Sequence, residues 1–250
     1  MSDKRNNWLA AVYPLLFIVA LLLGFIVRAA PGSDTLPPYY TPGTTGYDVS
    51  WPNCNSQLSR LAAWGVVGVT GGLVFHANPC LEQESTWFRA VSLYVNTGYP
   101  GGSRAAQFAT LPRHCAAHDE RCLAYNYGYN AGLYSVRLAS KYNIHAAWWW
   151  LDVETENSWS DDPYVNRESL VGMIDAIKRQ TVFARVGFYS YPGQWALITG
   201  NWAGENLPAW AATGSRERGA AIAACKAESF TGGPLMLTQY TATLDRNYVC

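Results

Sequence analysis

Asp152 and Glu154 are the residues of this chain whose type and spacing are best suited to chemistry. They end an apolar, aromatic run, Trp-Trp-Trp-Leu-Asp-Val-Glu, at residues 148–154. Such a run is typical of a buried β-strand, and side chains two positions apart on a strand lie on the same face, with Cα atoms about 6.6 Å apart. Two carboxyl groups that converge on one bond are what glycoside hydrolysis requires. The pattern therefore predicts a catalytic pair; the alternative is a strand whose tip has reached solvent.

The same alternation assigns the other side chains of this run to two faces. Trp148 and Trp150 are expected on the face of the two acids, and Trp149, Leu151 and Val153 on the opposite face. An aromatic ring offers a flat apolar surface on which a sugar can stack. We therefore expect Trp150 to contact substrate.

The composition limits the classes of partner. The 250 residues carry no net charge, only 14% of them are charged, and no basic run occurs after residue 30. These features argue against nucleic acid as a partner. The 11 Trp and 16 Tyr residues are compatible with a carbohydrate site, although ordinary core packing accounts for most of them.

The amino-terminal segment predicts export. Residues 8–27 form 20 uncharged, mainly apolar positions preceded by Lys4 and Arg5. That length can span a bilayer, and the leading positive charges favour a cytoplasmic amino terminus. The alternative is a signal peptide that is cleaved after Ala29 and releases a secreted protein.

The remaining sequence predicts one exported domain on a tether. Residues 1–29 are the expected anchor, and residues 30–45, rich in Pro, Gly and Thr, are the expected tether. Residues 46–250 are long enough for a single domain with a sizeable core. We expect this domain to be a monomer.

Six cysteines follow the export segment, an even number that favours disulfides in an oxidising compartment. One pairing that fits the chain, among several that the sequence leaves open, is Cys54 with Cys80, Cys115 with Cys122, and Cys225 with Cys250. His114 and His118 are spaced to bind zinc on a helix, but export favours a disulfide there. We expect no metal and no cofactor.

Strand-like and helix-like segments alternate through the domain. Strands are expected at 46–50, 65–70, 91–96, 146–154, 184–190, 208–212 and 235–240. Helices are expected at 123–140, 163–179 and 216–229, and an irregular loop at 97–122. This alternation indicates parallel strands joined by crossovers. No glycine-rich phosphate-binding motif follows any strand, so a mostly parallel, TIM-barrel-like (β/α) barrel is favoured over an open nucleotide-binding sheet.

The polar residues at the ends of these strands predict where the site lies. Asp48 ends the first strand, Asp152 and Glu154 the fourth, Tyr189 the fifth and Gln239 the seventh. In β/α barrels, the site gathers at the carboxyl-terminal ends of the strands. We therefore expect these side chains to meet at one end of the barrel.

Several short motifs resemble the lysozyme-like muramidases of glycoside hydrolase family 25. They occur in the order found in that family and span residues 46 to 248, nearly the whole exported domain. The chain departs from the family after the first motif, where Trp-Pro-Asn-Cys stands at 51–54. The matching segments are Gly46–Trp51, Leu151–Glu154, Gly187–Ser190, Pro208–Ala211, Gln239–Thr241 and Leu244–Tyr248.

The resemblance implies an incomplete β/α barrel of five βα units followed by irregular strands, and cleavage of peptidoglycan glycan between sugars. It makes Glu154 the general acid. Asp152 becomes its partner, which either stabilises positive charge or orients an acetamido group of the substrate. Further residues would line the cleft or contact substrate: Asp48, Asp245, Tyr189, Trp210 and Gln239. Retaining, inverting and substrate-assisted routes all stay open.

Two other functions fit the same residues. One is a non-catalytic carbohydrate-binding or cell-wall-binding protein on the same barrel, because a fold does not guarantee activity. The other is a structural envelope protein whose acidic residues bind a cation such as calcium. Four candidate acids, at positions 48, 152, 154 and 245, favour an enzyme over both.

Overall fold

The computed structural model describes residues 40–56 and 62–250. All of them belong to the second of the chain's two units, Leu36–Cys250; the first unit is Met1–Thr35. The predicted apolar anchor at 8–27, the cleavage position after Ala29 and most of the predicted tether lie outside the described residues. Within the described ranges, no helix has the length and hydropathy needed to cross a membrane.

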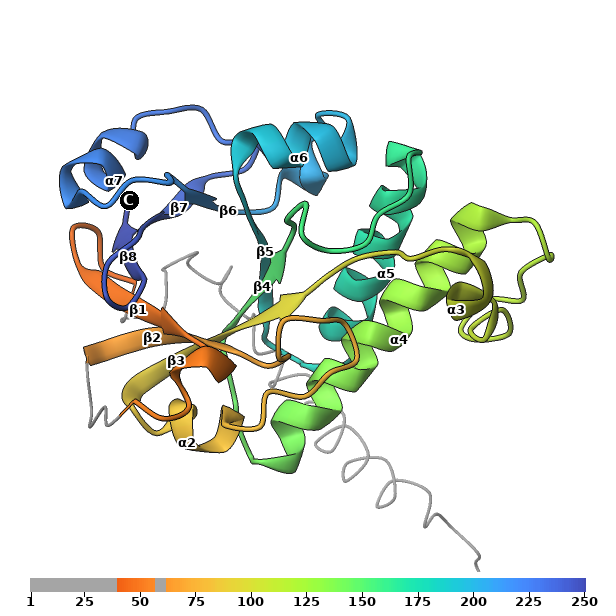
Figure 1. The fold of residues 1–250 in the computed structure, drawn as a ribbon, viewed down its shortest axis with the longest axis horizontal. Coiled ribbons are helices and arrows are strands. Elements are labelled where there is room, and N and C mark those ends of the chain that lie inside the picture. Colours follow the sequence, from red (N-terminus) through yellow and green to blue (C-terminus); the bar gives the residue numbers. More distant parts are fainter. Residues whose placement is uncertain (1–39, 57–61) are drawn as a thin grey trace, which may run out of the picture. The chain divides into compact units, whose positions relative to one another are not determined.

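The domain is built on a closed barrel of eight strands in sequence order (Figure 1). Strands β1 to β7 pair in parallel, and β8 is antiparallel to both of its neighbours, β7 and β1. The predicted mostly parallel barrel is confirmed, and β8, which was not expected as a strand, closes it. The strands are β1 Thr45–Val49, β2 Ala62–Gly68, β3 Phe88–Asn96, β4 Trp148–Asp152, β5 Arg185–Ser190, β6 Ala209–Ala212, β7 Leu235–Tyr240 and β8 Arg246–Val249.

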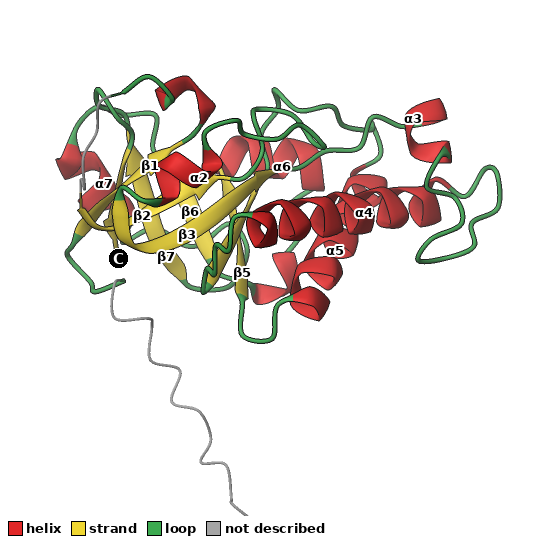
Figure 2. Cartoon of the chain, turned by 90° about the horizontal axis from the view of Figure 1, so that it is seen from below, coloured by secondary structure: helices red, strands yellow, loops and turns green. Residues whose placement is uncertain are grey.

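The helical layer around the barrel is uneven. Two long helices, α4 and α5, lie side by side against one side of the barrel, while the other crossovers hold short helices (Figures 1 and 2). The three predicted helices are confirmed as α4, α5 and α7. The helices are α2 Leu81–Ser85, α3 Gly102–Ala106, α4 Glu120–Lys141, α5 Pro163–Gln180, α6 Pro192–Thr199 and α7 Arg218–Ala224, with 3₁₀ turns η1 Trp51–Asn53 and η2 Gly204–Asn206.

Helices α4 and α5 pack closely because glycines face each other's backbone. A Cβ added at Gly128 would lie 1.8 Å from the carbonyl oxygen of Ser169, and one at Gly172 would lie 2.0 Å from that of Tyr125. Any larger side chain at either glycine would push the helices apart. The outward face of β4 joins the apolar core that these helices cover, as its alternation predicted.

The interior of the barrel is filled by aromatic rings. Trp148 and Trp150 stack with centroids 5.4 Å apart. The hydroxyl of Tyr40 accepts a hydrogen bond from the indole of Trp150 at 3.1 Å and donates one to Ser92 at 2.7 Å. Gly187 makes room for Trp150, because a Cβ at this glycine would lie 2.4 Å from the ring. Tyr40, which falls in the predicted tether, is therefore part of the barrel core, with only 1% of its surface exposed.

Three disulfides stabilise the loops, in the pairing that was hypothesised from the sequence: Cys54–Cys80, Cys115–Cys122 and Cys225–Cys250. Because Cys115 and Cys122 are bonded to each other, neither is free to ligate zinc beside His114 and His118. Among the residues that the structure describes, no three His, Cys, Asp or Glu side chains are placed to hold a metal ion together.

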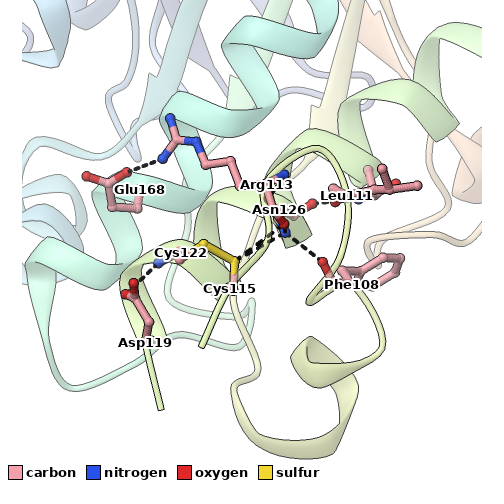
Figure 3. The surroundings of a disulfide bond; sticks show 9 residues. Phe108, Leu111, Arg113, Cys115, Asp119, Cys122, Asn126 and Glu168 are labelled. Carbon is pink, nitrogen blue, oxygen red and sulfur yellow. Dashed lines mark hydrogen bonds and ion pairs between the residues drawn. A yellow bond between two sulfur atoms is a disulfide. The ribbon is translucent and has the colours of Figure 1, made fainter. Parts of the chain in front are cut away.

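The long segment between β3 and α4 is ordered by one buried asparagine (Figure 3). The amide of Asn126, on α4, donates hydrogen bonds to the backbone carbonyls of Phe108 and Arg113, both at 2.7 Å. The adjacent Cys115–Cys122 disulfide ties the same segment to the first turn of α4. The segment predicted as an irregular loop therefore contains a short helix, α3, and is held against α4.

Candidate active site

A small pocket opens at the carboxyl-terminal end of the parallel strands. It encloses about 150 Å³. It brings together every predicted site residue except Trp150, and it adds Tyr94. Its lining consists of Asp48, Tyr94, Asp152, Glu154, Tyr189, Trp210, Gln239 and Asp245.

Trp150 lies below this pocket and not in its wall. It has the orientation that the alternation predicted, but it is two residues deeper along β4 than Asp152, and none of its surface is exposed. Its ring makes an edge contact with Trp210, at 5.9 Å between centroids. Trp210 lines the pocket, so Trp150 supports the site from beneath.

Asp152 is held at the end of β4 by an oriented amide. Asn96, the last residue of β3, donates from Nδ2 to Asp152 Oδ2 at 2.7 Å. The other end of the same amide is fixed, because Asn96 Oδ1 accepts from Thr70 Oγ1 at 2.9 Å and from the backbone N–H of Gly72 at 3.1 Å. Asn96 therefore presents a donor, never an acceptor, to this carboxyl group.

Asp152 and Glu154 share one partly buried environment, and each alters the pKa of the other. Burial raises the pKa of Asp152 well above its usual range, the charge of Glu154 raises it further, and the donor of Asn96 lowers it. Burial also raises the pKa of Glu154, with a further contribution from the exposed Glu156. Asp152 Oδ1 has no donor among the described residues. One proton shared between the two carboxyl groups would satisfy that oxygen and would remove the repulsion of two adjacent negative charges.

A third carboxyl group, that of Asp48 on β1, lies across the pocket from Asp152 and Glu154. Asn247 Nδ2 donates to its Oδ2 at 2.8 Å, and Gln239 Nε2 lies 3.2 Å from both of its oxygens. The hydroxyl of Tyr189 donates to Gln239 Oε1 at 2.7 Å, which turns the amide of Gln239 towards Asp48. Burial and the neighbouring charge of Asp245 raise the pKa of Asp48 to about 7, against the lowering effect of these donors.

The pocket contains acids without bases. Four of its eight lining residues are Asp or Glu, and no Lys, Arg or His of the described residues lines it. Burial also raises the pKa of Asp245 above its usual range. Without a cation to neutralise them, the carboxyl groups in this pocket retain protons to higher pH than exposed acids do. This arrangement can donate a proton and can stabilise developing positive charge.

Three residues of the site were not predicted: Tyr94, Asn96 and Asn247. A single Tyr or Asn in a strand has no pattern that separates it from a structural residue. Asn96 could have been found, because it ends its strand on the same side of the barrel as Asp48 and Asp152 do. Asn247 lies within the matching segment Leu244–Tyr248, but it was not singled out because no strand was expected where β8 lies.

Comparisons with known proteins agree with this geometry. A family model described as lysozyme-like protein 1 matches residues 124–223, a segment that runs from α4 to α7 and includes Asp152 and Glu154. No curated protein sequence matches the chain significantly.

Two solved structures are similar to this chain at low sequence identity. A muramidase from Acremonium alcalophilum is 13% identical, with 82% of this chain and 93% of that chain covered and a TM-score of 0.51. A bacterial lysozyme from Streptomyces coelicolor is 17% identical, with 84% and 93% covered and a TM-score of 0.49. The first of these shows a shared fold. The resemblance predicted from the sequence is thus confirmed: the chain resembles lysozyme-like proteins in sequence over residues 124–223 and a muramidase in its fold.

Proposed function

We propose that this chain is an exported muramidase-type glycoside hydrolase that cleaves the glycan strands of peptidoglycan. The observation that carries the proposal is the convergence of four carboxyl groups, without a neutralising base, in one pocket at the carboxyl-terminal end of the barrel. The match of the surrounding segment to a lysozyme-like family supports the substrate class.

Glu154 is the general acid in this proposal. A glycosidic acid must keep its proton near neutral pH until it transfers it to the leaving oxygen. Burial and the negative charges of Glu156 and Asp245 raise the pKa of Glu154 in that direction, against the lowering effect of Asp152. Glu154 is also half-buried at the pocket wall, whereas Asp152 is only 5% exposed, so Glu154 is the member of the pair that a glycosidic oxygen can approach.

Asp152 is the partner carboxylate. Once the shared proton sits on Glu154, the donor from Asn96 favours the ionised form of Asp152. A carboxylate at that position stabilises an oxocarbenium-like transition state or orients a substrate acetamido group. Asp48 and Asp245 line the opposite wall, and Tyr189, Trp210 and Gln239 supply the remaining substrate contacts.

The three disulfides favour an oxidising compartment, which agrees with export. The apolar residues 8–27 then serve either as a membrane anchor or as a cleaved signal peptide.

The test compares release of soluble fragments from purified peptidoglycan by the wild-type chain, Glu154→Gln and Asp161→Asn. The first substitution keeps the shape of the side chain and removes its titratable proton, and we expect a loss of roughly 10²- to 10⁴-fold in rate. Asp161 is exposed and outside the pocket, so its variant should keep full activity. Equal release by all three proteins would refute the assignment. Tight binding to peptidoglycan without release by the wild type would instead indicate a carbohydrate-binding protein.

A further inference from the structure

Two apolar side chains protrude from the end of the barrel opposite the active site. The loop of residues 181–184 joins the end of α5 to the start of β5, so it lies at the amino-terminal end of the strands. Val182 is 85% exposed and Phe183 is 90% exposed at the tip of this loop. No other pair of adjacent large apolar residues in the described ranges is this exposed. A valine and a phenylalanine in water at a loop tip gain free energy if an apolar phase covers them.

Basic residues lie in the last turns of the two long helices, which end at this end of the barrel. Lys141 is in the last turn of α4, and Lys178 and Arg179 are in the last turn of α5. All three are exposed, and none forms an ion pair with a carboxylate within the described residues. Residues 137–151 and 176–191 contain no Asp or Glu. The nearest acid along α5 is Asp175, one turn before Arg179, and it accepts a hydrogen bond from Tyr125. We call Lys141, Lys178, Arg179, Val182 and Phe183 the basal face.

The surface beside the tip is hollow and mainly apolar. A cavity of about 420 Å³ separates the loop from the end of α4, and Ile144, Ala146 and Trp149 form part of its wall together with Val182 and Phe183. Lys141 and Arg179 lie over the rings of Tyr142 and Tyr129. The basal face therefore combines protruding apolar side chains with positive charge that has no carboxylate partner among the described residues, and it lies beside an apolar recess. This combination matches an interface that contains both acyl chains and phosphate groups.

The chain enters the barrel at the same end. The ring of Tyr40 packs against Trp64 and Trp148, which lie near the starts of β2 and β4. Only twelve residues, 28–39, separate Tyr40 from the apolar segment at 8–27. Twelve residues span about 40 Å at most, so an apolar segment held in a bilayer would keep this end of the barrel close to the surface.

We propose that the basal face rests on an anionic lipid surface, with Val182 and Phe183 inserted between headgroups and the basic side chains on lipid phosphates. The active-site pocket, at the other end of the strands, then opens away from the membrane. A second copy of the chain is a weaker candidate for the occupant, because two protruding side chains are far from the roughly 1,000 Å² that a stable interface buries. The proposal concerns this surface alone and does not depend on glycan cleavage.

The test places an environment-sensitive fluorophore at each end of α5 in the full-length chain. Phe183→Cys labels the basal face, and Tyr164→Cys labels an exposed position in the first turn of the same helix. A helix of 18 residues separates its two ends by about 27 Å. Both labelled proteins are reconstituted with phosphatidylcholine vesicles that either contain or lack phosphatidylglycerol.

With phosphatidylglycerol, we expect the probe at position 183 to shift to the blue and to be quenched by nitroxide-labelled lipid, while the probe at position 164 stays in water. Salt should weaken the effect because it screens the phosphates. Equal emission from the two positions would overturn the proposal. A blue shift at position 183 that rises with protein concentration without lipid would overturn it too, in favour of a second copy.

Charge reversal provides an independent arm. Lys178→Glu combined with Arg179→Glu should reduce the ratio of inserted to water-exposed probe at position 183, by about five-fold for each basic side chain removed. The matched control is Arg216→Glu with Arg218→Glu, at the start of α7, where the chain has just left the carboxyl-terminal end of β6. Insertion that responds equally to both double variants would contradict a role for the basal face.

Discussion

Removal of the Asn96 amide should move the pH dependence of the reaction. Asn96 is the one amide donor to Asp152 among the described residues, at 2.7 Å, and two hydrogen bonds to its own oxygen fix its direction. In Asn96→Ala, Asp152 loses the interaction that favours its ionised form and keeps the burial that disfavours it. The pKa of Asp152 must therefore rise further.

The size of the shift follows from the type of hydrogen bond. A hydrogen bond to a charged group contributes about 1.5–3 kcal/mol, and one pKa unit corresponds to about 1.4 kcal/mol. We therefore expect the acid limb of the rate profile, where the carboxyl pair first loses a proton, to move up by roughly one to two pH units. At the pH optimum of the wild type, the variant should then be slower even where substrate binding is intact.

The assay is kcat/KM on soluble peptidoglycan fragments as a function of pH, for the wild type, Asn96→Ala and Asn126→Ala. The last variant is the matched control: Asn126 is as buried as Asn96 is, but it donates to backbone carbonyls of the segment beside α4 and touches no carboxyl group. It should lose stability and keep the wild-type profile. If the profile of Asn96→Ala superimposes on that of the wild type, Asn96 does not control the ionisation of Asp152, and the reasoning is wrong.

Two further predictions concern stability. Glu84 is buried and Asp48 is half-buried, and each has a pKa of about 7 in the folded chain, above its ordinary value. Between the ordinary pKa of each group and its pKa in the folded chain, the folded state therefore binds more protons than the unfolded state does. The free energy of unfolding should therefore fall as the pH rises from about 5 to 8. In denaturant titrations, Glu84→Gln should flatten this dependence on pH. A free energy of unfolding that rises over the same pH interval would contradict the raised pKa of Glu84 and Asp48. Gly187→Ala should lower the free energy of unfolding by about 1–3 kcal/mol, because the added Cβ would lie 2.4 Å from the ring of Trp150. The control is Gly193→Ala, whose added Cβ has no atom within 4 Å and should leave the free energy of unfolding unchanged. Thermal melts of the two variants and the wild type make this comparison.

The alternation of side chains along one strand carried much of what could be predicted. The run at 148–154 gave the direction of each side chain on β4, because a strand permits only two faces. It did not give depth: Trp150 faces the same way as Asp152 but lies beneath the ring of Trp210, a residue 60 positions later in the chain. Whether the ring of Trp210 covers that of Trp150 depends on the register between β5 and β6. The sequence of β4 contains no information about that register.

Two hydrogen-bonded partners of the acids, Asn96 and Asn247, were not predicted. Asn247 reaches Asp48 only because β8 runs antiparallel beside β1 and closes the barrel. The four residues of β8, Arg-Asn-Tyr-Val, do not alternate between polar and apolar types, so they do not predict a strand without their neighbours. Strand ends were a better guide, since the carboxyl-terminal ends of parallel strands meet at one end of the barrel whatever the details of packing.

The most direct test of the proposed function is the chemical identity of the ends that the chain creates. Peptidoglycan digested with the wild-type chain is reduced with borohydride, and the soluble fragments are analysed by mass spectrometry. We predict fragments that end in a reduced muramic acid residue with the wild type, and their loss with Glu154→Gln. Fragments that end in another residue, or the same fragments from both proteins, would contradict muramidase cleavage by the acid at position 154.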